Sequence, residues 1–545
     1  MPRLRFETVW PLAAVLGLFA CVFGATLMLI QSYNNGRFVY ALDDAYIHMA
    51  VAKHVVRDGV WGITRDGFTS LSSSPLWTLL LAGLYRLFGP TEWLPLAMNF
   101  FSALGALWLF HHLLLRLGLG PAQRFLISSA FLFLTPLPSA VFTGQEHVLH
   151  TFLILWLVWT AASILVPFPA CGVPALATVC VPAFLAVSVR YESAFLVAAV
   201  SLLFFIKGEG RKGVLVAISG SLPILLYGAV SVLEGWSWLP TSLLLKGQMP
   251  DFHSLGAILS ALGLSAYSQM MLNPHLLFPA LGTCLFLIIA SRREDFFQSR
   301  AQVIGAVFLI GLFLHLQLAR MGWYYRYEAY LLGLAALVLA CVFPVLCSGW
   351  HSLMKVRAKA LSIGLALLAA WPLLIRGYGA LISIPTASRN IYEQQIQMAS
   401  FVHQYYEGTA VAANDIGAIN YFADIHCLDL AGLGSRDVAD LKRSGHLTPE
   451  AIARLCREAH VRIAIVYDSW YHHLGGLPKA WIKCGEWRIQ NNIVCGSDIV
   501  SFYAVVPDEA EPLRMHLREF APRLPERVIQ SGPFIYDGGI SAGMP

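Results

Sequence analysis

The chain has 545 residues, of which 57% are hydrophobic and only 13% are charged. That charged share is about half of what soluble domains carry, and a soluble fold of this length cannot bury so many apolar side chains. The same composition excludes an intrinsically disordered chain. The sequence therefore predicts a membrane protein with several spans.

The charged residues are distributed unevenly along the chain. Residues 1–376 contain 23 Lys and Arg against 14 Asp and Glu, whereas residues 377–545 contain 14 against 18. The basic excess lies in loops between apolar runs, so it indicates membrane topology and not nucleic-acid binding. We expect a polytopic α-helical membrane domain over 1–384 and a soluble α/β domain over 385–545.

A transmembrane helix needs about 20 mostly apolar residues. The sequence offers eleven candidate spans, at 10–31, 93–115, 124–140, 147–166, 173–189, 193–206, 213–233, 275–290, 301–319, 327–348 and 359–377. With the N-terminus in the cytoplasm, every Lys and Arg cluster of the short loops lies inside. Eleven crossings then leave the C-terminal domain outside, which predicts a bacterial inner-membrane protein with an extracytoplasmic domain.

The long first outer loop, 32–75, carries the sharpest motif, LDDAYIH at 42–48. The apolar spacing that follows predicts an amphipathic surface helix. Asp43 would begin it, and Asp44 and His48 would share a face at i,i+4. Helix capping needs only one acid. A pair directly after a span suggests a general base, with a second carboxylate that orients a substrate, raises its neighbour's pKa or holds a divalent cation.

Cations near the same membrane face would suit a phosphate-bearing leaving group. The candidates are Lys246 in LPTSLLLKG, and Arg320 and Arg326 in ARMGWYYRYEAY. Their structural alternatives are a snorkelling lysine and, for the arginines, an ion pair with Glu328 or a topology charge.

Further candidate substrate contacts lie near the outer ends of spans. They are Glu146 in TGQEH, Arg190 and Glu192 in VRYE, and Trp77 at the end of a serine-rich loop. Tryptophan stacks on sugars but also marks membrane interfaces. The charged residues have structural alternatives too, because Arg190 and Glu192 could pair with each other and Glu146 could cap a helix.

The sequence shows no HExxH, zinc-ligand spacing, P-loop or GxSxG motif. A dedicated transition-metal site, nucleotide-driven transport and a serine hydrolase are therefore not indicated. Cys484 and Cys495 flank a predicted hairpin in the C-terminal domain, where an oxidising compartment would favour a disulfide between them.

The C-terminal domain has alternating helix and strand patterns. We expect helices at 391–406 and 448–460, the latter with Thr448 as N-cap, and strands at 409–414, 425–430, 461–467 and 500–506. Asp415 and Asp429 precede glycines and fit turn or cap roles. This domain is expected to bind the acceptor or to stabilise the fold.

Together these pieces resemble the GT-C superfamily of membrane glycosyltransferases. The resembling segments run in order: LDDAYIHMAVAKHVVRDGVWG, SSSPLWTLLLAGL, TGQEHVLH, VRYESAFLV, LPTSLLLKG, RYEAYLL and VAANDIGAINYFADIHCLDLAGLGSRD. The last is similar to the membrane-distal domain of the subgroup that contains cell-wall arabinofuranosyltransferases. The sequence departs from the family pattern at Gln145 and His147 and at Tyr191, which leaves the sugar open.

The resemblance implies an inverting transfer from a polyprenyl-phosphate-linked sugar, such as arabinofuranose or mannose, to a glycan, lipid or protein acceptor of the cell envelope. It implies Asp43 as the base, Asp44 as its partner and Lys246 at the donor phosphate. Two alternatives stay open: an oligosaccharyltransferase or ligase using a pyrophosphate-linked glycan, and a transporter or flippase without enzymatic activity.

Overall fold

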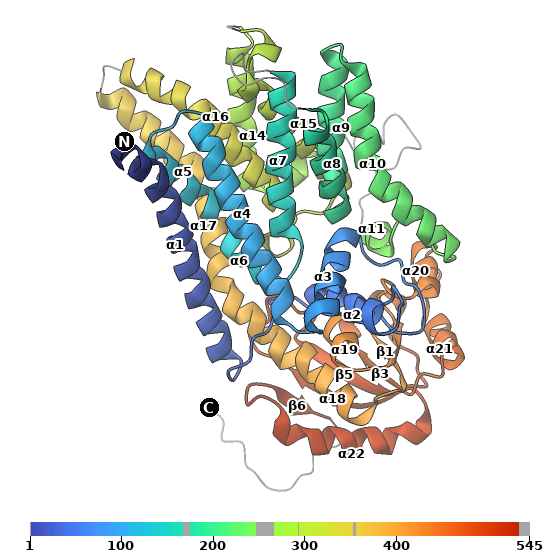
Figure 1. Ribbon diagram of the computed structural model, residues 1–545. Coiled ribbons are helices and arrows are strands. Elements are labelled where there is room, and N and C mark those ends of the chain that lie inside the picture. Colours follow the sequence, from blue (N-terminus) through green and yellow to red (C-terminus); the bar gives the residue numbers. More distant parts are fainter. Residues whose placement is uncertain (1, 167–174, 247–265, 293, 353–355, 533–545) are drawn as a thin grey trace.

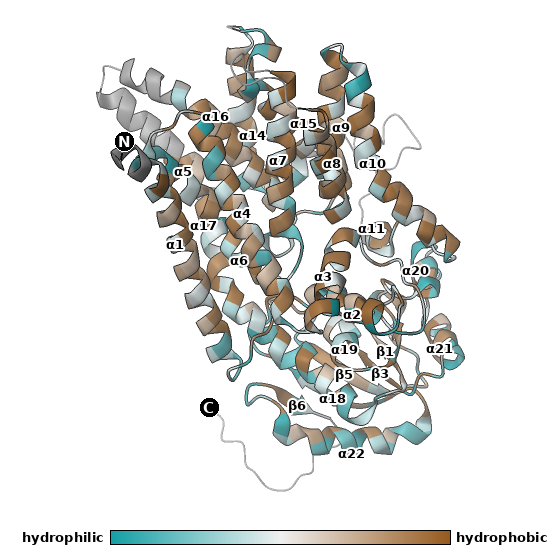
Figure 2. Cartoon of the chain, in the orientation of Figure 1, coloured by the Kyte–Doolittle hydropathy of each residue, from teal (hydrophilic) through white to brown (hydrophobic). Residues whose placement is uncertain are grey.

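The computed structural model describes residues 2–166, 175–246, 266–292, 294–352 and 356–532. A layer of long helices occupies one end of the molecule, and an α/β domain occupies the other (Figure 1). The N-terminus lies at the end of the helical layer that is far from the α/β domain. The long helices are coloured as mostly apolar, whereas polar residues gather over the α/β domain (Figure 2).

The helical part begins with α1 and ends with α17. Its helices are α1 (Pro2–Tyr33), α2 (Asp44–Arg57), α3 (Pro75–Phe88), α4 (Trp93–Arg116), α5 (Pro121–Leu134), α6 (Leu137–Val141), α7 (His147–Leu165), α8 (Ala177–Val189), α9 (Ser193–Ile206), α10 (Gly210–Leu233), α11 (Thr241–Lys246), α13 (Ala266–Leu272), α14 (Pro274–Ala290), η2 (Phe296–Gln298), α15 (Arg300–Leu318), η3 (Trp323–Tyr325), α16 (Ala329–Ser352) and α17 (Val356–Ile391).

The helices match the predicted multi-pass membrane domain. Within the described ranges, six helical stretches are long and apolar enough to cross a membrane, and five shorter apolar helices accompany them. The predicted span 124–140 is divided at Thr135–Pro136 into α5 and α6, because proline cannot supply the backbone N–H that a continuous helix needs. The pair α8 and α9 is interrupted at Arg190, whose backbone is extended.

The predicted surface helix of the first outer loop is present as α2. Helix α3 follows it, and the two helices pack against each other where the helical layer meets the α/β domain (Figure 1). Every residue from Ala45 to Ala52 is buried, so α2 is covered on all sides over two turns. The predicted position on the outer surface is therefore wrong, since α2 is packed between other elements, including α3 and α19.

The predicted division at 384/385 falls inside a continuous helical rod. Helix α17 runs into a five-residue π-helical turn, η4 (Tyr392–Ile396), and then into α18 (Gln397–Tyr405). In Figure 1 this rod leaves the helical layer and enters the α/β domain. The chain therefore connects its two parts by a helix and not by a flexible linker.

The C-terminal domain is built on one six-stranded mixed sheet in the order β2-β1-β3-β5-β4-β6. Strand β1 is parallel to β2 and β3, and the remaining neighbours are antiparallel. The strands are β1 (Ala410–Ala413), β2 (His426–Asp429), β3 (Ile463–Val466), β4 (Ile482–Arg488), β5 (Ile499–Ala504) and β6 (Ile529–Ser531), and the helical segments are α19 (Gly417–Phe422), α20 (Arg436–Arg443), α21 (Pro449–Glu458), η5 (Asp468–Leu474), η6 (Pro507–Glu509), α22 (Ala510–Phe520) and η7 (Ala521–Arg523).

The four predicted strands coincide with β1, β2, β3 and β5. Thr448 caps α21 as expected, since its hydroxyl accepts a hydrogen bond from the backbone N–H of Ala451 at 3.2 Å. Strands β4 and β5 form the predicted hairpin.

The expected disulfide in this hairpin is wrong, because Cys484 and Cys495 are both free thiols. The Cys484 thiol points toward α22 and donates to the carbonyl of Ala510 at 3.4 Å. Cys495 lies in the β4–β5 loop and donates to the side-chain oxygen of Gln395 at 3.3 Å. The two sulfurs therefore face different elements.

Helix α19 is the element through which the C-terminal domain docks on α2. At its start, the Asp43 carboxylate accepts hydrogen bonds from the backbone N–H groups of Gly417 and Ala418, both at 2.8 Å. At its end, the Lys53 ammonium donates to the carbonyls of Asn420 and Tyr421, at 3.0 and 2.8 Å. These are the groups that a helix leaves unpaired at its termini, and each charge has the sign that the helix dipole favours.

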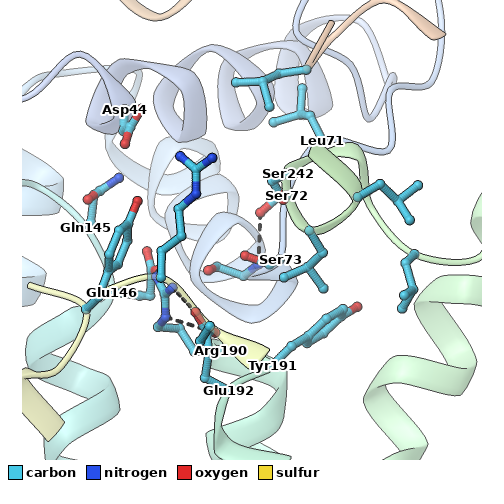
Figure 3. Close-up of a pocket in the computed structure, with 18 of the residues that line it drawn as sticks. Asp44, Leu71, Ser72, Ser73, Gln145, Glu146, Arg190, Tyr191, Glu192 and Ser242 are labelled. Carbon is cyan, nitrogen blue, oxygen red and sulfur yellow. Dashed lines mark hydrogen bonds and ion pairs between the residues drawn. The ribbon is translucent and has the colours of Figure 1, made fainter. Parts of the chain in front are cut away.

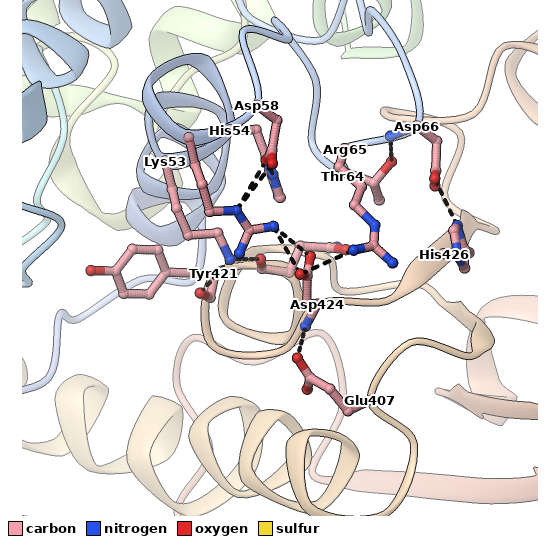
Figure 4. Close-up of polar contacts among 12 residues, drawn as sticks. Lys53, His54, Asp58, Thr64, Arg65, Asp66, Glu407, Tyr421, Asp424 and His426 are labelled. Carbon is pink, nitrogen blue, oxygen red and sulfur yellow. Dashed lines mark hydrogen bonds and ion pairs between the residues drawn. The ribbon is translucent and has the colours of Figure 1, made fainter.

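Exposed ion pairs surround this contact (Figure 4). One terminal nitrogen of the Arg57 guanidinium donates to both carboxylate oxygens of Asp424, at 2.9 and 2.8 Å, and Arg65 approaches the same carboxylate at 3.4 Å. His426 and Asp66 are 2.7 Å apart. Such exposed pairs stabilise by about 1 kcal/mol or less each. They therefore contribute little to the stability of the docked state beside the buried contact of α19.

Gly417 is required by the close approach of the two backbones. A Cβ at this position would lie 2.2 Å from the main-chain oxygen of Asp43. We expect Gly417→Ala to destabilise the docked state by about 1–3 kcal/mol, the usual cost of overpacking, and to lower the melting temperature in detergent. Gly67→Ala is the matched control, since its Cβ meets nothing within 4 Å. Identical melting of the Gly417→Ala variant and the control would contradict this contact.

Candidate active site

Helix α2 presents the acidic motif at the junction between the helical layer and the C-terminal domain. Asp44 is its first residue, and Asp44 and His48 line the same cavity, as their i,i+4 spacing predicts. Asp43 precedes the helix and turns toward α19. The two neighbouring carboxylates therefore face different surroundings.

Arg326 holds Asp44 from the opposite side of the site. Its guanidinium lies 2.5 Å from the Asp44 carboxylate and also donates to the side-chain oxygen of Gln145. The ring of Tyr327 lies 4.9 Å from the same guanidinium. Glu328, the expected alternative partner, instead pairs with Arg376 at 2.7 Å. The structure therefore brings Arg326 to the acidic motif and leaves Glu328 to a separate buried pair.

Arg190 joins the TGQEH segment to its own VRYE segment. It pairs with Glu146 at 2.6 Å and with Glu192, so the TGQEH and VRYE motifs meet (Figure 3). His48 approaches the other Glu146 oxygen at 3.7 Å, and that oxygen has no hydrogen-bond partner within the described residues. The arrangement fits the structural alternative of paired charges, and it also leaves one buried acceptor facing the cavity.

His48 is held as a neutral side chain. Burial lowers the pKa of its imidazole below the ordinary value, and the nearby carboxylates of Glu146 and Asp44 oppose this shift only in part. Its Nδ1 lies 2.8 Å from the hydroxyl of Thr78. A neutral imidazole beside Glu146 can hydrogen-bond a substrate hydroxyl without adding charge.

Two predicted residues are not placed at the site. Trp77 is fully buried and lines neither of the two cavities described below, so it cannot stack on a sugar there. Lys246 ends α11, but its side chain lies outside the described part of the chain. Its role at a phosphate stays a prediction.

The first cavity has a volume of about 720 Å³ and is lined by charged, apolar and hydroxyl-bearing residues. The charged lining residues are Asp44, Glu146, Arg190, Glu192, Arg320, Arg326 and Arg443. The apolar ones include Phe195, Ile224, Leu239, Leu243, Leu244 and Leu318, from α9, α10, α11, α15 and the loop before α11, and Ser72, Ser73, Ser74 and Ser242 add hydroxyl groups. Such a cavity can hold a molecule with a long apolar portion and an anionic group.

Arg320 is a cation available to such an anion. It lines the first cavity and is exposed. Its guanidinium makes no hydrogen bond or ion pair with any residue that the structure describes. By contrast, Arg190 and Arg326 are already paired with carboxylates.

A second cavity of about 540 Å³ lies between α2, the η3 loop and the C-terminal domain. Its lining includes Asp43, Asp44, Trp323, Asp415 and Trp470. Asp44, Arg320, Arg326 and Tyr327 line both cavities. Among the described carboxylates, Asp44 alone is shared, so the two cavities meet at this residue.

Asp43 is a carboxylate of unusual basicity. Burial and the neighbouring charge of Asp415 raise its pKa from the ordinary value to about 8, although the backbone N–H groups of Ala418 and Gly417 act in the opposite direction. A carboxylate with a pKa near the working pH is suited to general base catalysis.

Sequence reasoning missed the contacts of three residues here. Asp415 was assigned to a turn, but it accepts hydrogen bonds from Tyr467 at 2.6 Å and from Gln395 at 2.9 Å. Tyr467 and Gln395 are 52 and 20 positions from Asp415, so no local pattern could reveal the contact. Asp429 does act as expected, since its carboxylate closes a turn to the N–H groups of Ala431 and Gly434.

The sequence suggested that the second carboxylate of the acidic motif could hold a divalent cation. Within the described residues, no group of three or more His, Cys, Asp or Glu side chains converges to hold a metal ion.

Comparison with known proteins identifies the fold. The family model of a domain of unknown function, DUF8728, matches residues 389–503, and no curated protein matches the chain. The structure is similar to ArnT from Cupriavidus metallidurans bound to undecaprenyl phosphate, with 13% identity, a TM-score of 0.52, and coverage of 91% of this chain and 99% of that one.

It is also similar to the Archaeoglobus fulgidus oligosaccharyltransferase in its apo form. Here the identity is 12% and the TM-score is 0.51, and the match covers 92% of this chain and 75% of that one. Both similarities span the membrane helices and the C-terminal domain together. The prediction of fold class is thus confirmed, and the chain has the fold of the GT-C superfamily.

Proposed function

We propose that the protein is a glycosyltransferase that moves a sugar from a polyprenyl-phosphate donor to an acceptor hydroxyl at the outer face of the membrane. The observation that carries the proposal is the meeting of two different cavities at Asp44, Arg320 and Arg326. One has an apolar extension among the membrane helices, and the other opens between α2 and the C-terminal domain. A transfer between a lipid and a water-soluble acceptor requires two such compartments.

The donor fits the first cavity. The apolar lining would take the isoprenoid chain, and Arg320 would bind the phosphate without losing an existing ion pair. Arg326 lies beside it and would balance the negative charge that grows on the phosphate as the glycosidic bond breaks. ArnT from Cupriavidus metallidurans, which shares the fold, was crystallised bound to undecaprenyl phosphate. We extend that class of ligand to this chain.

The acceptor fits the second cavity, and Asp43 is the proposed base. An acceptor hydroxyl would give its proton to the Asp43 carboxylate, and its oxygen would attack the anomeric carbon. The bond from that carbon to the phosphate oxygen would break, so polyprenyl phosphate leaves and the anomeric centre is inverted. Asp44, with its charge balanced by Arg326, would orient the sugar where the two cavities meet.

The membrane topology is part of the same proposal. We place the N-terminus in the cytoplasm and the C-terminal domain outside, in a bacterial inner membrane, as the distribution of Lys and Arg predicts. The acceptor would then be a glycan, lipid or protein of the cell envelope. The donor sugar stays open between arabinofuranose, mannose and related sugars.

The base assignment predicts a specific pH dependence. Since Asp43 must be ionised to accept a proton and its pKa is raised to about 8, we expect kcat/KM to rise about tenfold per pH unit below 8 and to level off above it. Asp43→Asn should lower transfer by about 10²–10⁴-fold, the usual contribution of a general base. The measurement is release of polyprenyl phosphate from synthetic polyprenyl-phosphate sugars in detergent.

Asp66→Asn is the matched control, because it removes an exposed carboxylate from the same outer loop. It should retain full activity. Normal transfer by Asp43→Asn would refute the base role. If Asp44→Asn alone abolished transfer and the profile were flat between pH 6 and 9, Asp44 would replace Asp43 as the base.

The donor assignment predicts a bound lipid. Polyprenyl monophosphate should co-purify with the wild-type protein and be seen by native mass spectrometry. Arg320→Ala should lose most of it while melting like the wild type, since no described residue depends on that guanidinium. Arg65→Ala, at an exposed arginine of the outer loop, should keep the lipid. A pyrophosphate-linked oligosaccharide in its place would instead support the oligosaccharyltransferase alternative.

A further inference from the structure

The surroundings of Asp43 come largely from the C-terminal domain. Gly417 and Ala418 at the start of α19 donate to its two oxygens, each at 2.8 Å. Two positions before Gly417, Asp415 lines the second cavity, as Asp43 does. The residue that we assign as the base is thus held by a loop that is more than 370 residues away in the chain.

A buried chain of polar groups fixes Asp415 in turn. One of its carboxylate oxygens accepts from the Tyr467 hydroxyl at 2.6 Å and from the Gln395 amide at 2.9 Å. The Gln395 amide also donates to the Tyr467 oxygen at 2.9 Å, and its own oxygen accepts from the Cys495 thiol. Tyr467 and Gln395 are almost fully buried, so their donors have no competing water.

The π-helical turn η4 explains how the connecting helix reaches this network. Gln394 and Gln395 are consecutive, yet both contact the Tyr467 hydroxyl, at 2.7 and 2.9 Å. Both residues belong to the π-helical turn. Such turns are rare and occur often at functional sites. This one lies where the rod from the membrane layer enters the C-terminal domain.

We propose that Asp415, with Tyr467 and Gln395 behind it, positions Asp43 for catalysis, so that the C-terminal domain completes the active site only when docked on α2. The inference rests on the proposed function. It assigns to this domain a role in the chemistry itself, beyond binding an acceptor.

The electrostatics agree with this geometry. Tyr467 and Gln395 donate to Asp415 and so favour its ionised form. That negative charge, together with burial, raises the pKa of Asp43. The titratable and charged groups that face this region are Asp44 on α2, Asp415, Tyr467 and Cys495 in the C-terminal domain, Glu393 on η4, Lys442 on α20, and Arg320 and Arg326 across the cavity.

The test is the effect of Asp415→Asn on the titration of Asp43. Removing the neighbouring charge should lower the pKa of Asp43, so the acid limb of the pH–rate profile moves to lower pH. If the limb moves by one pH unit, the rate at a given pH on that limb rises about tenfold. Tyr467→Phe should move the limb in the same direction by a smaller amount, because it removes one donor that keeps Asp415 ionised. Asp498→Asn, an exposed site in the same domain, is the matched control and should leave the profile in place.

A second readout does not require activity. The carboxyl band of Asp43 can be isolated as the infrared difference between wild-type protein and Asp43→Asn, and then titrated. We expect it to titrate at lower pH in Asp415→Asn and in Tyr467→Phe. Two folded variants that titrate like the wild type would overturn the inference. If no polyprenyl-phosphate sugar were turned over by the wild type, the proposed function would fail while the infrared titration would still decide this point.

Discussion

The contact between α2 and α19 is the constraint on which the rest of the site depends. Asp43 satisfies the free N–H groups at one end of a six-residue helix, and Lys53 satisfies the free carbonyls at the other. So short a helix has little stability of its own. Its packing on α2 therefore fixes the C-terminal domain and one wall of the second cavity together.

Charge pairing explains how so many ionisable groups lie at the membrane face. Uncompensated charges are costly near the bilayer. Arg190 is shared by Glu146 and Glu192, and Arg326 binds Asp44. Arg320 lines the same cavity and has no ion pair with any described residue, whereas Arg443 makes a contact of 3.8 Å with Asp440. Under the proposed function, the donor phosphate would complete this pattern, and the apolar residues of the cavity would contact the lipid chain.

Local sequence patterns predicted the elements of the fold. Contacts between residues far apart in the chain could not be predicted from such patterns. Helix α2 and the Asp44–His48 spacing follow from periodicity within a few residues, and the Thr448 cap follows from one turn of sequence. The predicted disulfide was wrong because two cysteines that are close along a hairpin can still point their thiols toward different elements. The spacing of Asp43 and Asp44 could not separate their roles, since the difference arises from α19 on one side and Arg326 on the other.

That difference gives a reason for two adjacent acids. Neighbouring residues at a helix start point in different directions, so one motif can serve two cavities. Asp44 pairs with Arg326 and lines both cavities, while Asp43 lines only the second and faces the segment with Asp415. A carboxylate paired with a guanidinium is a poor proton acceptor but a good anchor. A buried carboxylate beside another negative charge binds protons more tightly. Under the proposed function, the chain would separate orientation of the sugar, at Asp44, from proton transfer, at Asp43, by one residue, and the docked C-terminal domain supplies the surroundings that distinguish the two acids.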